Sequence, residues 1–141
     1  MTAREYLLQI YILDRTINDK LDKIYLLKTT FYSTSGLSEN ERVQMSSDKD
    51  RTGNAVARIV DLEREVEGLV DRYVDLKKQV ILYISQLKKQ KHQFILTKRY
   101  IYYKSMRDIA DELGMSERGC KKAHKKALEE ISIIIKQYIV F

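Results

Sequence analysis

Hydrophobic residues recur at helical spacing along most of this chain. In its first part they fall seven residues apart, at Ile10, Ile17, Ile24 and Phe31. Apolar residues at this spacing line one side of an α-helix. The pattern predicts a first helix over residues 2–32, in which Thr2 and Glu5 form a capping box at the N-terminal end.

The longest regular repeat lies in residues 52–91 and predicts one long helix. Its two apolar positions per heptad are filled by Ile59, Val66, Tyr73, Val80 and Leu87 and by Leu62, Leu69, Leu76 and Tyr83. A repeat of this length is typical of a coiled coil. At about 1.5 Å per residue the helix is about 60 Å long, which is too long to bury its apolar stripe inside a small domain. We therefore expect it to pair with the first helix as an antiparallel hairpin and also with another subunit, most simply in a homodimer.

Between these two helices, residues 33–54 are small, polar and aperiodic, and they predict a flexible loop. Its isolated Gly36 lacks the spacing of a phosphate-binding glycine loop. The chain has no proline, which agrees with helices joined by short turns. The expected fold is all-α. It consists of a helical hairpin or coiled-coil oligomerisation module over residues 1–91 and a second domain over residues 92–141.

The net charge of +6 is unevenly distributed. Residues 88–126 hold 12 Lys or Arg and 4 Asp or Glu, whereas the parts before and after this segment each carry a net charge of −1. A basic segment of this kind indicates a polyanionic partner. Charge alone leaves DNA, RNA and an anionic membrane surface open, and also a solvated face that binds nothing.

Within the basic segment, residues 106–128 fit a helix-turn-helix. Ile109 and Leu113 lie four residues apart and share the buried face of a first, short helix. Gly114 follows, where a turn with a positive φ angle favours glycine. Ser116 then suits the N-cap of the second helix. Spacing, turn residue and cap therefore agree on the same motif.

The second helix of this motif has an apolar side and a charged side. Its inward residues are Cys120, Ala123, Ala127 and Ile131, and its outward residues are Glu117, Arg118, Lys121, Lys122 and Lys125. Such a helix fits the major groove of double-stranded DNA, where basic side chains reach phosphates and guanine edges. The predicted DNA-binding set is completed by Arg107 and Ser116.

The sequence MRDIADELGMSER at residues 106–118 resembles region 4 of the sigma-70 family. Residues 97–100 resemble the arginine-tyrosine helix that precedes the motif in that family. The whole chain is similar to phage-encoded regulators of the RinA/ArpU type, through the EYL sequence at residues 5–7 and the IVDLE sequence at residues 59–63. This resemblance implies control of phage or prophage genes, often late genes. It also implies DNA reading by the outward side of the second motif helix.

Gly119 and Cys120 depart from the sigma pattern, which has a bulky or polar residue followed by Val or Ile. A glycine inside a helix costs about 1 kcal/mol relative to alanine. Either this helix is fully ordered only on DNA, or Gly119 permits close approach of a backbone or a partner. Cys120 lies on the inward side and is expected in the core. A lone cysteine also suits the reducing cytoplasm of a bacterial host cell.

Other candidate chemistry is sparse. His92 and His124 lack the spacing of metal ligands, so we expect no metal and no cofactor. His124 is expected to contact either the DNA backbone or a neighbouring helix. Tyr100, Tyr102 and Tyr103 are candidates for the surface, with packing favoured for Tyr100. No carboxylate pair or Ser-His arrangement points to catalysis, and we predict that the protein is not an enzyme.

The apolar tail at residues 131–141 is expected either to pack against the second helix or to form a subunit interface. We find no signal peptide and no segment that could span a membrane. The leading prediction is a sequence-specific DNA-binding transcriptional regulator. Two alternatives stay open: a DNA-recognition subunit of a phage packaging terminase, and a protein-interaction module that binds RNA polymerase.

Overall fold

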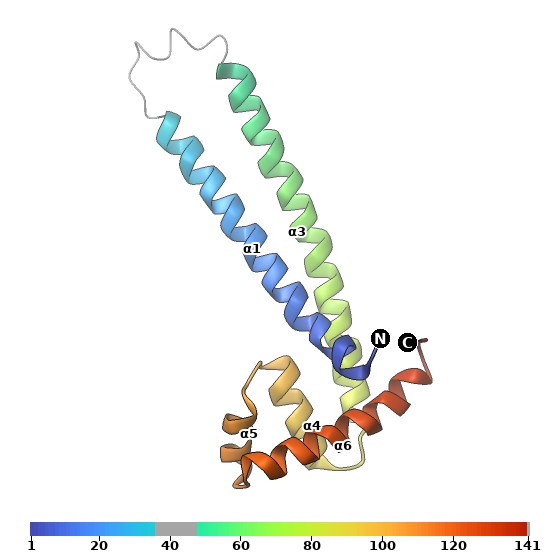
Figure 1. Ribbon diagram of the computed structural model, residues 1–141. Helices are drawn as coiled ribbons and strands as arrows, with labels where there is room; N and C mark the ends of the chain where they lie inside the picture. The colour runs from blue at the N-terminus through green and yellow to red at the C-terminus, as the bar shows by residue number, and fades with distance from the viewer. Residues whose placement is uncertain (36–47, 141) are drawn as a thin grey trace. The chain divides into compact units, whose positions relative to one another are not determined.

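The computed structural model of the protein describes residues 1–35 and 48–140, and these confirm the all-α prediction (Figure 1). The helices are α1 (Ala3–Ser35), α3 (Asp48–Ser85), α4 (Gln90–Leu96), the π-helical turn η1 (Thr97–Ile101), α5 (Met106–Leu113) and α6 (Glu117–Lys136). No β-strand occurs in the described residues. Among the described residues, none of the helices has the length and apolar content that a membrane span requires.

The first turn of α1 is held by the predicted capping box. The Glu5 backbone N–H donates to Thr2 Oγ1 at 3.2 Å, and the Thr2 backbone N–H donates to Glu5 Oε2 at 3.1 Å. These bonds satisfy N–H groups that the start of a helix leaves without an intrahelical acceptor. The first turn of α1 is therefore fixed by its own side chains.

The predicted loop over residues 33–54 is helical at both ends. Residues 33–35 belong to α1, and residues 48–54 belong to α3. The prediction is wrong there because neither end contains a residue that stops a helix: Gly53 costs only about 1 kcal/mol. The middle of the predicted loop, 36–47, lies outside the described residues.

The long helix also ends earlier than the predicted residue 91, at Ser85. The side-chain amide of Gln93 donates to the Leu87 carbonyl at 2.7 Å. It thereby takes the place of the backbone N–H that would bond to this carbonyl if the helix continued. Leu87 is still buried, at 4% exposure, because the turn after α3 returns it to the core.

Contacts between residues divide the chain into two units. Unit 1 consists of Met1–Asp14 together with Arg72–Phe141, and unit 2 consists of Arg15–Asp71. The predicted division between an oligomerisation module at 1–91 and a DNA-binding domain at 92–141 concerns the roles of these segments and stays a prediction.

Unit 2 is an antiparallel pair formed by the later part of α1 and the earlier part of α3. Its buried residues lie at heptad positions named in the sequence, namely Ile17, Ile24, Ile59 and Val66. Lys20 pairs with Glu65 at 2.7 Å and Lys28 pairs with Glu63 at 3.0 Å. Because these ion pairs are largely exposed, they contribute little stability. The buried apolar residues therefore hold the pair together.

Unit 1 has a core to which both ends of the chain contribute. Helices α1, α3, α4 and α6 meet in one apolar cluster, whose fully buried members include Leu7, Ile10, Val80, Leu96, Ile131 and Ile135. The tail thus packs against α3, and the rings of Tyr83 and Tyr138 lie 5.5 Å apart. Ile133 and Val140 are exposed, and a subunit interface through the tail stays a prediction.

Candidate nucleic-acid interface

A second apolar cluster in unit 1 joins α4, α5 and α6. Ile95 of α4, Ile109 and Ala110 of α5, and Cys120 of α6 are buried in it. The prediction that Cys120 is a core residue is confirmed, at 0% exposure. Burial raises the pKa of the Cys120 thiol, and this disfavours the thiolate that nucleophilic or metal-binding chemistry requires.

The turn between α5 and α6 has the geometry predicted for a helix-turn-helix. Gly114 has φ 64° and ψ 35°, in the left-handed region. Its N–H donates to the Asp111 carbonyl at 3.2 Å, and the Met115 N–H donates to the Ala110 carbonyl at 3.0 Å. These two bonds form the Schellman motif that ends many helices. Met115 packs against the α4–α5–α6 cluster and so fills the turn.

Serine residues cap both helices of the motif. Ser105 Oγ accepts a hydrogen bond from the Asp108 N–H at 3.2 Å, and Ser116 Oγ accepts one from the Gly119 N–H at 3.0 Å. A Cβ atom at Gly119 would lie 3.1 Å from Ser116 Oγ and 3.3 Å from Met115 Cε. Gly119 is helical here, and the groups that approach it closely are its own N-cap and the turn residue.

Gly114→Ala is expected to lower the free energy of unfolding by about 1–2 kcal/mol, because an L-residue is strained in the left-handed region. An added Cβ meets nothing within 4 Å, so the cost comes from the backbone alone. Gly68→Ala in α3 is the matched control: its Cβ also meets nothing within 4 Å, and alanine in a helix gains up to about 1 kcal/mol. Thermal unfolding should show opposite shifts for the two variants. A Gly114→Ala variant as stable as the parent would contradict the turn geometry.

The charged side of α6 is exposed as predicted. Its exposed residues are Glu117, Arg118, Lys121, Lys122 and Lys125. At 3.6 residues per turn, their positions fall within an arc of about 140° around the axis of α6. Arg107 is exposed in the first turn of the neighbouring helix α5, and Ser116 is exposed at the N-cap of α6. The structure therefore gathers most of the predicted DNA-binding set on one face of one helix.

Most cations on this face keep their charge unpaired within the chain. Lys121 pairs with Glu117 at 3.4 Å, one helical turn away, and an exposed pair of this kind is weak. Among the described residues, Arg118, Lys122 and Lys125 take part in no ion pair. We call this face, from Glu117 to Lys125, the cationic face of α6.

Two lysines just before the motif, Lys98 and Lys104, share one carboxylate within the chain. Lys104 and Lys98 lie 3.0 Å and 3.7 Å from the carboxylate of Glu112. The hydrogen bond from Lys104 is the main reason why the pKa of Glu112 falls below its usual value. Lys98 Nζ also lies 5.3 Å from the ring centroids of Phe94 and Tyr102. These lysines are less available to an anionic ligand than those of α6.

His124 lies on α6 but contacts the neighbouring element η1. Its Nε2 is 2.8 Å from Tyr100 Oη, and the two rings are stacked with centroids 5.7 Å apart. Burial, followed by the positive charges of Arg99 and Arg4, lowers the pKa of His124 to about 4. The imidazole is therefore neutral at neutral pH. Of its two predicted contacts, the structure shows the one with a neighbouring helix.

The three tyrosines named as surface candidates have different environments. Tyr102 is exposed and Tyr100 is buried, as expected. The prediction for Tyr103 is wrong, because its ring is half-buried and meets the ring of Tyr11 edge-on at 5.2 Å. The chain turns at Tyr103, whose φ angle is 58°. Burial first, and then the Tyr73 and Asp14 side chains, raise the pKa of its hydroxyl.

His92 is buried, with Nδ1 3.3 Å from Glu130 Oε2. In the described part of the chain, no group of three or more His, Cys, Asp and Glu residues is placed to hold a metal ion.

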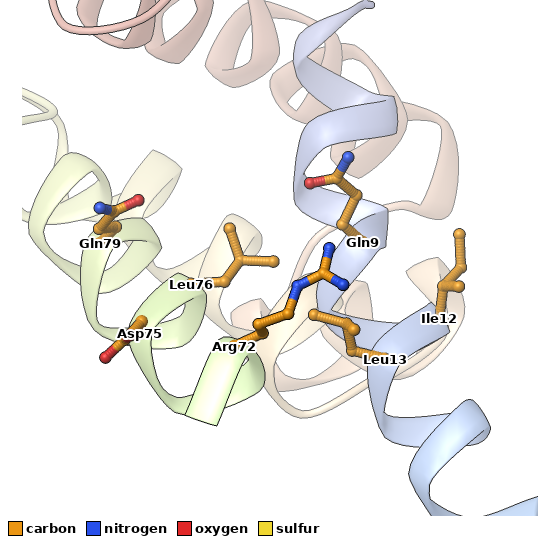
Figure 2. Close-up of a pocket in the computed structure, with 7 residues that line it drawn as sticks. All are labelled: Gln9, Ile12, Leu13, Arg72, Asp75, Leu76 and Gln79. Atoms are coloured by element: carbon orange, nitrogen blue, oxygen red, sulfur yellow. The ribbon is translucent and has the colours of Figure 1, made fainter. Parts of the chain in front are cut away.

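A groove of about 510 Å³ lies between α1 and α3 in unit 1. Figure 2 shows the Arg72 side chain extending from α3 towards Gln9 and Leu13 of α1. Asp75 is the acid and Arg72 the base among the lining residues, so the groove carries no net charge. A phosphate backbone binds where cations concentrate, and the candidate interface therefore remains the cationic face of α6.

Comparison with known proteins relates part of this chain to transcription. It is 38% identical over 69 residues to the RNA polymerase sigma factor SigO of Bacillus subtilis (strain 168), an alignment that covers 46% of this chain and 39% of that protein. The chain thus spans about two fifths of the relative it matches. No protein-family model and no solved structure matches the chain. The similarity supports a sigma-like domain in this protein.

Proposed function

We propose that the protein is a sequence-specific transcriptional regulator that binds double-stranded DNA through the helix-turn-helix of α5 and α6. The observation that carries this proposal is the cationic face of α6, which is exposed on a helix whose other side is anchored by Cys120, Ala127 and Ile131. A rigid helix with this division suits the major groove. Its similarity to part of a sigma factor supports a role in transcription.

The α6 residues divide into base and phosphate contacts by position and chemistry. Arg118 and Lys122 have the donors that guanine edges accept. Lys121 and Lys125, with Arg107 of α5, supply charge to phosphates and set affinity more than sequence preference. Glu117 has a carboxylate, which can accept a hydrogen bond from a cytosine amino group.

The resemblance to RinA/ArpU regulators supports control of phage or prophage late genes in the cytoplasm of a bacterial host. We propose that the protein has no catalytic activity and binds no cofactor. If the chain is a homodimer, its two α6 helices should reach DNA half-sites about 34 Å apart, or a multiple of this distance.

A second candidate is a module that binds RNA polymerase and not DNA. The sigma factor relative carries RNA polymerase in its name, and a basic face also suits an acidic protein surface. The affinity for duplex DNA separates the two, because the first candidate makes phosphate contacts, which release counterions from DNA and make this affinity fall as salt is raised.

The test is to enrich random DNA duplexes on the purified full-length protein, and then to measure affinity for the enriched duplex over a range of salt. We expect one enriched motif and an affinity whose logarithm falls linearly with the logarithm of salt, by about 0.9 per phosphate contact. The proposal fails if no sequence is enriched, or if affinity for DNA does not respond to salt.

A further inference from the structure

The first turns of α1 pack against the C-terminal half of α6, within unit 1 (Figure 1). Ala3 and Leu7 are buried in the same cluster as Ala127 and Ile131. The capping box fixes the backbone of this first turn. The position of the chain's N-terminus is therefore set by the same helix that carries the cationic face.

Arg4 lies on the exposed side of this first turn and extends the positive charge of α6. It lines a groove of about 530 Å³ together with Lys125 and Lys136 of α6, and Glu129 is the acid among the lining residues. Among the described residues, Arg4 takes part in no ion pair. Its charge also contributes to the lowered pKa of His124.

The length of α6 indicates which part of the DNA lies near Arg4 and Lys125 when α6 is bound in the major groove. The helix has 20 residues and is about 30 Å long, whereas the major groove is about 12 Å wide. If the first turns of α6 contact base edges, the residues from Lys125 onwards lie outside the major groove. They then lie beside the flanking sugar-phosphate backbone. Arg4 and Lys125 lie together at this crossing point.

We propose that Arg4 is a DNA-backbone contact, in which its guanidinium binds a phosphodiester beside the phosphate bound by Lys125. This inference rests on the proposed function. A planar guanidinium can donate two parallel hydrogen bonds to the two free oxygens of a phosphate. Since the first turn of α1 is already ordered, the contact requires no further ordering of the backbone there.

The test is the variant Arg4→Gln in the full chain, measured on the enriched duplex over a range of salt. We expect about 5-fold weaker binding at physiological salt, a salt slope smaller by about 1, and an unchanged sequence preference. Arg15→Gln is the matched control, since Arg15 is exposed on the same helix but belongs to unit 2. It should bind DNA as the parent does.

Three outcomes would overturn the inference. If Arg4→Gln binds as the parent does while alanine variants of the cationic face lose binding, the proposed function stands and Arg4 is no contact. If affinity falls with an unchanged salt slope, Arg4 acts through the fold or through a protein partner. If the variants of the cationic face also bind as the parent does, the proposed function itself fails and this inference fails with it.

Discussion

Replacing Arg118, Lys121 and Lys122 together by alanine is expected to weaken DNA binding by about 100-fold or more. A good contact to a base edge contributes about 1–3 kcal/mol of discrimination, and each lost phosphate contact reduces the counterion release that drives binding. The three side chains are exposed, so the helix content and the oligomeric state in solution should not change. Affinity is measured on the enriched duplex at one fixed salt concentration.

A second triple variant separates this effect from a change of overall charge. Arg58, Arg64 and Lys78 are exposed on α3, and replacing them by alanine removes the same three positive charges. This control should bind within a few-fold of the parent, because these residues lie away from the motif in sequence and on another helix. Parent-like binding by the α6 variant would show that the cationic face does not contact DNA. An equal loss in both variants would point to non-specific attraction.

The helix-turn-helix could be predicted from sequence because its signals are local. The turn ends α5 because the Gly114 N–H bonds to the carbonyl three positions before it and the Met115 N–H to the carbonyl five positions before it, and Ser116 caps α6 through a bond to Gly119. A heptad repeat likewise depends only on spacing along one helix, and Ile59 and Val66 are buried as it requires. Each of these features is decided within two turns of the chain, where residue type and spacing suffice.

Other features depend on contacts that no repeat along one helix reveals. The early end of α3 involves the side chain of Gln93, which folds back onto the Leu87 carbonyl six residues before it. The burial of Tyr103 involves Tyr11, which is far from it in the sequence. Arg4 was not a candidate, because a single arginine in the first turn of a helix carries no local sign of a ligand. Its position beside α6 follows only from the packing of Leu7 in the core of unit 1.

Leu7→Ala tests that packing, and it is expected to lower the free energy of unfolding by about 2–5 kcal/mol. Leu7 has 0% exposure and lies in one cluster with Ile131 and Ile135 of α6. Its truncation leaves a cavity where α1 and α6 meet, and a packed core closes such a cavity only partly. Denaturant-induced unfolding followed by circular dichroism measures the change.

Leu26→Ala is the matched control, because it makes the same substitution on the same helix at a side chain that is 65% exposed. Its effect should stay within about 0.5 kcal/mol. Equal stability of the Leu7→Ala variant and the parent would mean that the first turns of α1 do not pack on α6. Arg4 would then have no fixed place beside Lys125, although the cationic face of α6 would remain. A loss of stability in the Leu7→Ala variant, but not in the Leu26→Ala variant, would show that the N-terminal helix is a structural part of the domain that presents the helix-turn-helix.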